Sequence, residues 1–231
     1  ANKVALGYAA AGEYFLAHKV VQCGNIARPN VCRGDARRAR ERYGFTESKP
    51  VILVLGGSQG SHNINLHVVD ILEEILPLAQ MIHQTGSKNV DQVKSWASSR
   101  EGVKAGRRGY KVVGFLNETE YQDALAVADV VISRSGATSI AEIAACRKVS
   151  LLIPLASSAN DHQRMNAYVV AKGGGAVVLE EANLSVHVLL EKIKILLFDD
   201  SVRDQLRNDI GAFYDPESAQ KTARVMLETM K

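Results

Sequence analysis

Residues 51–61 read VILVLGGSQGS, an apolar and mostly β-branched run that leads directly into a glycine-rich turn. A run of this length, followed by a turn and a helical pattern at 62–76, is typical of a buried strand in a parallel sheet. Such sheets bind ligands at the carboxyl ends of their strands. Gly56, Gly57 and Gly60 would let the backbone approach a bound group, and the next helix would point its unpaired N–H groups at the same place. The stretch is therefore a candidate phosphate-binding loop.

Two other interpretations fit the same turn. Residues 56–60 (GGSQG) also match G-x-S-x-G, the nucleophile elbow of α/β-hydrolases, which would make Ser58 a nucleophile. A plain strand-to-helix turn without a ligand is the third possibility. Against the hydrolase, Ser58 follows the first strand of the alternating unit, so no earlier strand of that unit supplies the second oxyanion amide. The turn alone does not decide between a phosphate site and a structural turn.

Strands and helices alternate from this stretch onward. Strands are expected near 51–55, 80–84, 110–113, 129–132, 149–153 and 176–179, and helices near 62–76, 88–99, 118–127, 138–146, 161–172, 185–197, 201–209 and 217–230. Such alternation indicates βαβ units with right-handed crossovers. The sequence therefore predicts an α/β fold, a Rossmann-like doubly wound parallel sheet with helices on both faces.

Composition places the chain among globular proteins with a full core. Its 231 residues are 46% apolar, and the chain is about one and a half times as long as a modal domain. The net charge of +3 is too small to argue for nucleic acid, and the basic clusters at 28–42 and 100–111 lack interleaved aromatic residues. No apolar run approaches the roughly 18 residues that span a bilayer, so we expect a soluble protein, with peripheral membrane attachment left open.

Cysteine and histidine usage bears on redox state and metal binding. Cys23, Cys32 and Cys146 are odd in number and show no metal-ligand spacing, so we expect reduced thiols in a cytosolic protein. The 6 histidines form no H-E-x-x-H arrangement and do not cluster with cysteine. No metal or other cofactor is expected.

Residues 133–142 (SRSGATSIAE) form a second strand-loop-helix junction of the same design. A diphosphate between two helix N-termini is held better than at one, because each adds N–H donors and a partial positive charge. Glu142 has two interpretations. Ser139-x-x-Glu142 fits a capping box, which spacing alone favours. A nearby second phosphate loop would instead favour a carboxylate that accepts hydrogen bonds from a ribose diol.

Residues 159–167 (ANDHQRMNA) follow the strand near 149–153 and open the helix expected at 161–172, with Asn160 or Asp161 as the expected N-cap. His162 and Gln163 lie near its exposed start, where neutral donors and acceptors suit sugar hydroxyls. Taken alone, the segment is better explained as an ordinary polar first turn.

Together, three segments resemble the MurG family of bacterial glycosyltransferases, glycosyltransferase family 28. They are GGSQG at 56–60, RSGA at 134–137 with EIAA at 142–145, and DHQ at 161–163 with NA at 166–167. They occur in family order and at family spacing, and Gly24-Asn25 with Arg28 resembles the family's interdomain segment. The resemblance implies the C-terminal, donor-binding half of a GT-B enzyme. That family moves GlcNAc from UDP-GlcNAc to lipid I, giving lipid II for peptidoglycan synthesis, cell shape and division.

The resemblance also implies a domain organisation. Residues 1–24 would be the tail of an N-terminal acceptor domain, 25–49 an interdomain linker and helix, and 50–231 the UDP-sugar-binding domain. The last helix, 217–230, would pack back toward the N-terminal domain. Lipid I and the membrane surface would be contacted through that missing domain, at the cytoplasmic face of the plasma membrane. A donor subunit of a split lipid-linked GlcNAc transferase remains an alternative, as does the serine hydrolase.

By position, the resemblance implies a set of residues that bind UDP-GlcNAc. The set is Arg28, Ser58, Leu116, Ala137, Thr138, Ser139, Ile140, Ala141, Glu142, His162 and Gln163. Ser58 and the backbone of 137–139 would hold the diphosphate, and the backbone of Leu116 would face the uracil edge. Glu142 would bind the ribose hydroxyls.

The sugar and hinge contacts complete the implied set. Gln163, with His162, would meet the GlcNAc hydroxyls, and Arg28 would reach the donor from the hinge. Thr138 and Ser139 stand where the family pattern has Leu and Thr, so backbone contacts are expected there rather than side-chain contacts. No catalytic residue is expected in this chain, because the family's candidate base belongs to the N-terminal domain. The chain alone would bind UDP-GlcNAc weakly and transfer nothing.

Overall fold

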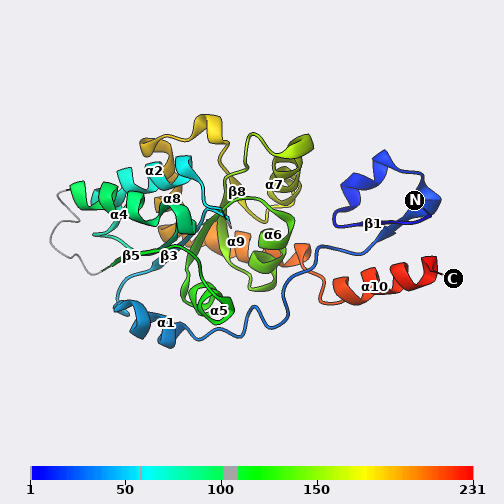
Figure 1. Ribbon diagram of the computed structural model, residues 1–231, viewed down its shortest axis with the longest axis horizontal. Helices are drawn as coiled ribbons and strands as arrows, with labels where there is room; N and C mark the ends of the chain where they lie inside the picture. The colour runs from blue at the N-terminus through cyan, green and yellow to red at the C-terminus, as the bar shows by residue number, and fades with distance from the viewer. Residues whose placement is uncertain (1, 58, 101–108, 231) are drawn as a thin grey trace.

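The computed structural model describes residues 2–57, 59–100 and 109–230 (Figure 1). The strands are β1 (Val4–Leu6), β2 (Val20–Gln22), β3 (Val51–Leu55), β4 (Gln80–Gln84), β5 (Tyr110–Val113), β6 (Val130–Ser133), β7 (Val149–Leu152) and β8 (Val177–Val178). The α-helices are α1 (Ala36–Tyr43), α2 (His62–Asp70), α3 (Leu72–Ile75), α4 (Val90–Ser99), α5 (Glu118–Val127), α6 (Ala137–Ala145), α7 (His162–Lys172), α8 (Val186–Phe198), α9 (Asp200–Ile210) and α10 (Ser218–Thr229). All the strands and helices predicted from residue 51 onward are present, within a few residues of their expected bounds.

Within the described residues, a 6-stranded parallel sheet has the order β5-β4-β3-β6-β7-β8. From β3 the chain proceeds through β4 to one edge, then crosses to β6 and proceeds through β7 to the other edge. The order therefore reverses between β3 and β6, whose last residues Leu55 and Ser133 are paired. This is the topological switch point at which doubly wound sheets bind ligands. The predicted fold class is confirmed.

Alternation along the central strand assigns the two faces of the sheet. Ile52 and Val54 pack in the core cluster that contains residues of α2, α4 and α8. Val51, Leu53 and Leu55 pack in the cluster that contains residues of α1, α5, α6 and α7. Figure 1 shows α2 and α4 on one side of the strands and α1 and α5 on the other. The helices that follow β3 and β6, α2 and α6, thus cover opposite faces of the sheet, although both begin at the carboxyl ends of their strands.

Two helix ends show how local sequence fixes the chain's path. Helix α1 ends at Gly44, whose φ of 64° is left-handed and suits glycine, as in many helix C-caps. The helix predicted over 62–76 is divided in two, because Ile71 between α2 and α3 has φ −93° and ψ 0°. At the start of α2, His62 contacts Trp96 of α4, with ring centroids 5.3 Å apart.

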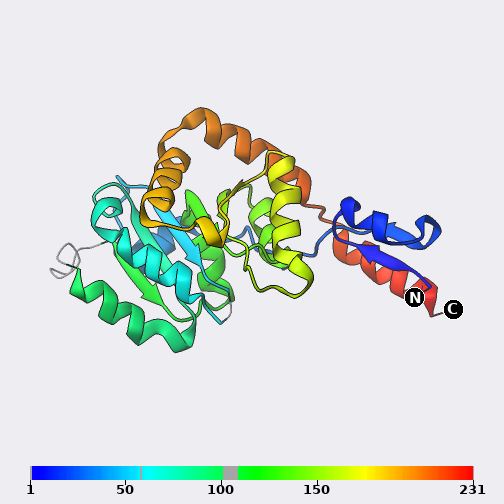
Figure 2. The same cartoon turned by 90° about the horizontal axis from the view of Figure 1, so that it is seen from above.

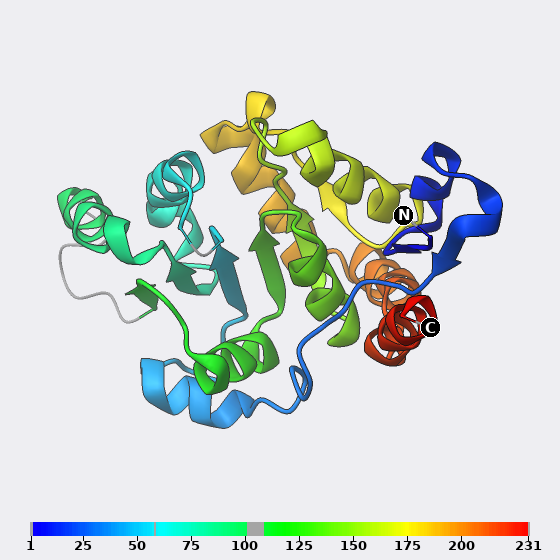
Figure 3. The same ribbon diagram turned by 45° about the vertical axis from the view of Figure 1, so that its right-hand side comes forward.

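The N-terminal strands form a separate unit. Strands β1 and β2 pair in parallel with each other, outside the large sheet. Figures 2 and 3 show this unit beside α10, apart from the main sheet. The chain just after β2 comes close to the start of α10 at Gly24, where an added Cβ would lie 2.5 Å from the Ser218 hydroxyl oxygen. The proposed domain boundaries and the packing of α10 toward a further domain stay predictions.

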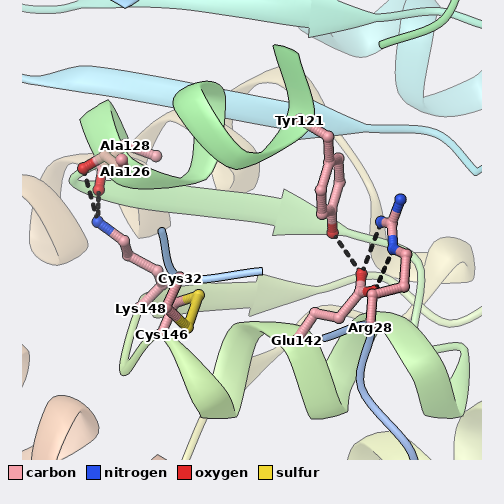
Figure 4. The surroundings of a disulfide bond; sticks show 8 residues. All are labelled: Arg28, Cys32, Tyr121, Ala126, Ala128, Glu142, Cys146 and Lys148. Atoms are coloured by element: carbon pink, nitrogen blue, oxygen red, sulfur yellow. Dashed lines mark hydrogen bonds and ion pairs between the residues drawn. A yellow bond between two sulfur atoms is a disulfide. The ribbon is translucent and has the colours of Figure 1, made fainter. Parts of the chain in front are cut away.

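The thiol prediction is wrong for two of the three cysteines. Cys32 and Cys146 form a disulfide with a Cα–Cα distance of 5.3 Å and a sequence separation of 114 residues. The linker that follows β2 runs across the C-terminal end of α6 and brings the two together (Figure 4). Cys23 is buried and free. Sequence spacing could not reveal a pair that depends on the path of the linker over the folded domain.

Candidate functional site

A cavity of 230 Å³ lies at the carboxyl ends of β3 and β6. It is bordered by Leu55 and Gly57 on the β3 side and by Ser133 on the β6 side. Of the residues predicted to bind a ligand, those that line the cavity are Arg28, Leu116, Thr138, Ser139 and Glu142. The switch point therefore carries a cavity, which the first glycine loop reaches at Gly57 and the second junction reaches through Ser133 and the first turn of α6.

The first loop turns sharply at two left-handed glycines. Gly57 and Gly60 have φ values of 87° and 78°. A Cβ on Gly60 would lie 1.9 Å from the carbonyl oxygen of Thr85, so only glycine fits that close approach. Ser61 is the N-cap of α2, and its side chain accepts a hydrogen bond from the Ile64 N–H. Ser58 lies outside the described residues, so its roles as phosphate ligand or nucleophile stay predictions.

The second loop leads into α6 without a side-chain cap. The N-cap is Gly136, which has no side chain to offer, and α6 begins at Ala137. The capping-box interpretation of Ser139 and Glu142 is therefore wrong, because Ser139 lies inside the helix. The N–H groups of the first turn, at 137–139, have no acceptor within the helix. They form the kind of helix N-terminus that binds anions.

Arg134 connects the loops that follow four strands. Its Nη2 donates to the Ser61 hydroxyl at 2.6 Å and to Glu181 Oε1 at 2.9 Å. Its Nη1 donates to the carbonyl oxygens of Ile153 and Pro154 at 3.2 and 3.1 Å. Arg134 belongs to one of the motifs that resemble the family, but this connecting role was not predicted. The available signal was a charged residue directly after a buried strand.

The electrostatics of that connection stabilise a charged carboxylate. Burial raises the pKa of Glu181, but hydrogen bonds from Arg134 and from the Ala156 N–H outweigh burial and hold the pKa below its usual value. Both side chains of the ion pair are 11% exposed. The loops on either side of the switch point are thus held by one buried guanidinium.

Glu142 points into the cavity and is paired with the linker. Its side chain is 2% exposed, and it accepts from Arg28 Nε at 2.5 Å and from Arg28 Nη2 at 3.0 Å. The Tyr121 hydroxyl donates to the same carboxylate at 2.8 Å (Figure 4). The Arg28 guanidinium also stacks over the Tyr121 ring at 4.2 Å. Sequence reasoning missed Tyr121, which lies in α5 and approaches Glu142 only in the fold.

These contacts shift the titration of the two partners of Glu142. The hydrogen bond that Arg28 donates to Glu142 raises the pKa of Arg28. Burial, followed by the charge of Glu142, raises the pKa of Tyr121. Both side chains therefore remain hydrogen-bond donors to Glu142 across the physiological range.

The other predicted positions on this side of the cavity contribute backbone or packing. Leu116 has a buried side chain, and its N–H donates to Gln84 Oε1 at 3.3 Å. Ile140 and Ala141 are buried, with Ile140 in the core cluster of its face. Any contact of these residues with a ligand would therefore come from the backbone.

His162 and Gln163 lie on the neighbouring loop, after β7. His162 is exposed and its Nδ1 lies 2.7 Å from the Ala159 carbonyl oxygen. Gln163 Oε1 accepts from the Leu155 N–H at 3.2 Å, and its carbonyl oxygen accepts from the Ser135 hydroxyl at 2.7 Å. These two predicted residues are not among those lining the 230 Å³ cavity. Ser135, in the loop after β6, bonds to Gln163.

The start of α7 differs from the predicted cap. Asn160 and Asp161 both have left-handed backbones, with φ values of 50° and 55°. Asp161 occupies the N-cap position, but the described structure gives its side chain no capping hydrogen bond. Non-glycine residues rarely adopt this conformation, and such strain gathers at functional sites.

Two other classes of site receive no support from the described part of the chain. Residues 2–57, 59–100 and 109–230 contain no group of three or more His, Cys, Asp or Glu side chains placed to hold a metal ion. In the same ranges, none of the helices has the length and apolar character needed to cross a bilayer.

Comparison with known proteins places this site in a family. The family model described as "Glycosyltransferase family 28 C-terminal domain" matches residues 51–216. Two similar curated relatives are named UDP-N-acetylglucosamine–N-acetylmuramyl-(pentapeptide) pyrophosphoryl-undecaprenol N-acetylglucosamine transferase. The one from Anaeromyxobacter sp. (strain K) is 33% identical over 96% of this chain and 55% of its own length. The one from Caldanaerobacter subterraneus is 35% identical over 94% of this chain and 59% of its own length.

A solved structure shares the fold. The crystal structure of Acinetobacter baumannii MurG superposes with a TM-score of 0.66 and 20% identity, covering 87% of this chain and 55% of that one. The chain spans a little over half the length of the curated relatives it matches. The chain belongs to glycosyltransferase family 28, whose C-terminal domain it carries over residues 51–216.

Proposed function

We propose that this chain is the donor-binding part of an inverting glycosyltransferase. The enzyme would move GlcNAc from UDP-GlcNAc to the 4-hydroxyl of MurNAc on lipid I, giving lipid II for peptidoglycan synthesis. The observation that carries the proposal is a cavity at the switch point that is bordered by the first glycine loop and by the first turns of α6, in a chain of this family. The names of the curated relatives support the choice of donor and acceptor.

The diphosphate would lie between the starts of α2 and α6. These helices begin at the ends of adjacent strands and leave on opposite faces, so their positive dipole ends would approach a bound diphosphate from two directions. Direct contact between the loops supports this arrangement, since Arg134 bonds to the N-cap Ser61 at 2.6 Å. Ser58 and the backbone of 137–141 would provide the hydrogen bonds.

The nucleoside would occupy the part of the cavity bordered by α5 and α6. Glu142 would accept hydrogen bonds from the ribose hydroxyls, and the backbone of Leu116 would face the uracil edge. Both residues line the cavity. Gln163 and His162 would meet the sugar from the loop after β7, while Arg28 would contact the donor from the linker.

This half of the enzyme would lower the barrier by stabilising the leaving group. The acceptor hydroxyl attacks the anomeric carbon while UDP departs, so negative charge develops on the diphosphate. Fixed N–H donors aimed at that charge stabilise the transition state more than the ground state. No catalytic base is assigned to this chain. A serine hydrolase acting through Ser58 does not fit membership in a glycosyltransferase family.

The acceptor and the membrane would be contacted by a further domain. We propose the division into a tail of that domain at 1–24, a linker with α1 at 25–49, and the donor domain at 50–231. Helix α10 would pack toward the further domain, and the enzyme would act at the cytoplasmic face of the membrane. This chain alone would bind UDP-GlcNAc weakly, and turnover of a lipid I analogue by it would contradict the division.

Calorimetry with UDP-GlcNAc, UDP-GalNAc and UDP tests the donor site. We expect the chain to bind UDP, and Glu142→Ala to lose about 1–3 kcal/mol of binding free energy because a buried ribose contact is removed. Glu191→Ala is the matched control, since Glu191 is an exposed carboxylate on α8, in the layer on the other face of the sheet. Absence of UDP binding by the unmodified chain would overturn the proposal. Unchanged affinity in Glu142→Ala would remove the ribose role.

A further inference from the structure

The linker is attached to α6 at two points with matching spacing. Arg28 pairs with Glu142, and Cys32 is bonded to Cys146, the C-cap of α6. On the linker, Cys32 follows Arg28 by four residues, and on α6, Cys146 follows Glu142 by four residues. This spacing places Glu142 and Cys146 along one side of the helix. Figure 4 shows the two attachments along the same helix. The covalent bond therefore lies one helical turn from the carboxylate that borders the cavity.

The disulfide is accessible to small molecules, whereas the third cysteine is not. Cys32 is exposed and Cys146 is partly exposed. Cys23 is buried, with 1% of its surface exposed. A low-molecular-weight thiol or disulfide can therefore reach the Cys32–Cys146 pair without unfolding of the chain.

Arg28 and a ribose diol would compete for Glu142. The carboxylate already accepts from Arg28 Nε, Arg28 Nη2 and the Tyr121 hydroxyl. A carboxylate has about four acceptor positions, so a diol that donates twice needs at least one that Arg28 or Tyr121 occupies. Arg28 is 43% exposed and comes from the linker, so it is the partner that can move away.

The disulfide sets how easily Arg28 moves away. With Cys32 bonded to Cys146, the linker segment 28–32 is tied to α6, and Arg28 stays at high effective concentration beside Glu142. Reduction releases that tie and leaves the ion pair to hold the linker there by itself. An ion pair with one half-exposed partner is weak in water.

We propose that Cys32 and Cys146 form a reversible redox switch for the donor site. In the disulfide form the linker keeps Arg28 on Glu142 and lowers the affinity for a nucleoside diphosphate. In the dithiol form Arg28 yields the carboxylate to the ribose and is free to contact the donor from the linker, so the affinity rises. This inference rests on the proposed function, because it takes Glu142 as the ribose ligand.

The chemistry is thiol–disulfide exchange with a glutathione-type disulfide as the oxidant. One protein thiolate attacks that disulfide, forming a mixed disulfide and releasing one small thiol. The second protein thiolate then attacks the protein sulfur of the mixed disulfide, which forms the Cys32–Cys146 bond and releases the second small thiol. The two cysteines lose two electrons and two protons, and the small disulfide is reduced to two thiols. A small dithiol reverses both steps.

Calorimetry with UDP on the 231-residue chain tests the switch. One sample is reduced with dithiothreitol and one is oxidised with glutathione disulfide, and mass spectrometry with thiol alkylation counts the free cysteines in each. We expect the reduced chain to bind UDP about 5-fold or more tightly than the oxidised chain, the lower range of coupling between two sites. Cys32→Ser and Cys146→Ser should bind like the reduced chain under both conditions. Cys23→Ala should keep the difference.

The outcomes separate this inference from the proposed function. Equal affinity in the two redox states, tighter binding by the oxidised chain, or failure of the disulfide to form would overturn the switch and leave the donor site standing. Absence of UDP binding in both states would overturn the donor site itself. Loss of the redox difference in Cys23→Ala would also contradict the assignment to Cys32 and Cys146.

Discussion

Two buried carboxylates of this protein are each paired with an arginine from the N-terminal part of the chain, and they differ in their relation to the cavity at the switch point. Asp123 on α5 accepts from Arg38 Nε at 2.7 Å, from Arg38 Nη2 at 2.6 Å and from the Asp35 N–H at 2.9 Å. Glu142 on α6 accepts from Arg28 and Tyr121 and lines the cavity at the switch point.

The difference lies in what surrounds each pair. Asp123 is fully buried, and Arg42 Nη1 also lies 3.5 Å from its Oδ2. The acceptor positions of Asp123 are therefore filled by groups of α1 and its N-cap residue, and these contacts attach α1 to α5. Glu142 keeps acceptor capacity next to an open cavity. The same kind of ion pair therefore fixes a helix in one place and borders the cavity in the other.

The largest effect should come from Arg134, whose ion pair with Glu181 holds together the loops at the switch point. Arg134→Met leaves Glu181 buried without its cation, and we expect the free energy of unfolding to fall by about 3 kcal/mol. UDP binding should weaken too, because Arg134 holds the loop after β3, which borders the cavity at Gly57. Chemical denaturation and calorimetry measure the two effects. Arg134→Met with Glu181→Gln should recover part of the stability, and a single variant as stable as the parent would contradict the role of Arg134.

His83 is a buried group with neutral partners, and the free energy of unfolding should depend on pH more strongly through His83 than through Asp123 or Glu142. Burial lowers the pKa of His83 from 6.5 to about 3. Its ring nitrogens contact the Tyr110 hydroxyl at 2.8 Å and Asn65 Oδ1 at 3.0 Å. Because the unfolded chain takes up a proton below pH 6.5 and the folded one does not, stability is complete above that pH and is lost as pH falls toward 3. The loss should reach about 2 kcal/mol at pH 5.

His83→Gln tests that assignment. Glutamine keeps a donor and an acceptor at the site but does not titrate, so the free energy of unfolding should vary less between pH 7 and 5 than in the parent. Denaturation at several pH values measures this. An equally steep pH dependence in the variant would assign the proton uptake to other groups.

The smallest effect separates the two carboxylates directly. Asp123→Asn should lower the free energy of unfolding by about 1 kcal/mol at pH 7 and leave UDP affinity unchanged, since Asp123 does not line the cavity. Glu142→Gln should weaken UDP binding with less effect on stability. Equal effects of the two variants on UDP affinity would break the distinction between them.

Acid should narrow the stability difference between the parent and Asp123→Asn. Burial raises the pKa of Asp123, but hydrogen bonds from Arg38 and the Asp35 N–H lower it further, so the pKa lies below its usual 3.8. The contribution of this carboxylate is therefore present above pH 3.8 and is lost as pH falls through the folded value. Denaturation at pH 7 and pH 3 measures the change.

The fold was predictable because its signals are local. The runs at Val51–Leu55 and Val149–Leu152 are buried on both sides and marked their own positions in the sequence. Gly44 ends α1, since one left-handed residue is enough to stop a helix. The break at Ile71 was not predictable, because neither glycine nor proline marks it.

The site was predictable only in part because its contacts are distant in sequence. The loops at Gly60 and Gly136 were recognised from adjacent residues. The partner of Glu142 was not, since Arg28 lies 114 residues away and spacing within α6 favoured a cap instead. The disulfide was not predicted for the same reason, because its cysteines are 114 residues apart. The hydrogen bond from Arg134 to Ser61 was not predictable either, because it forms only when the two loops are already in place.

The contact between His62 and Trp96 gives the molecule a built-in optical reporter. The chain contains 1 tryptophan, and its indole meets the first residue of α2 at the loop that approaches the cavity. Intrinsic fluorescence excited at that indole should therefore change when an anion draws the start of α2 toward itself. A titration could follow occupancy in a cuvette without any added dye or label.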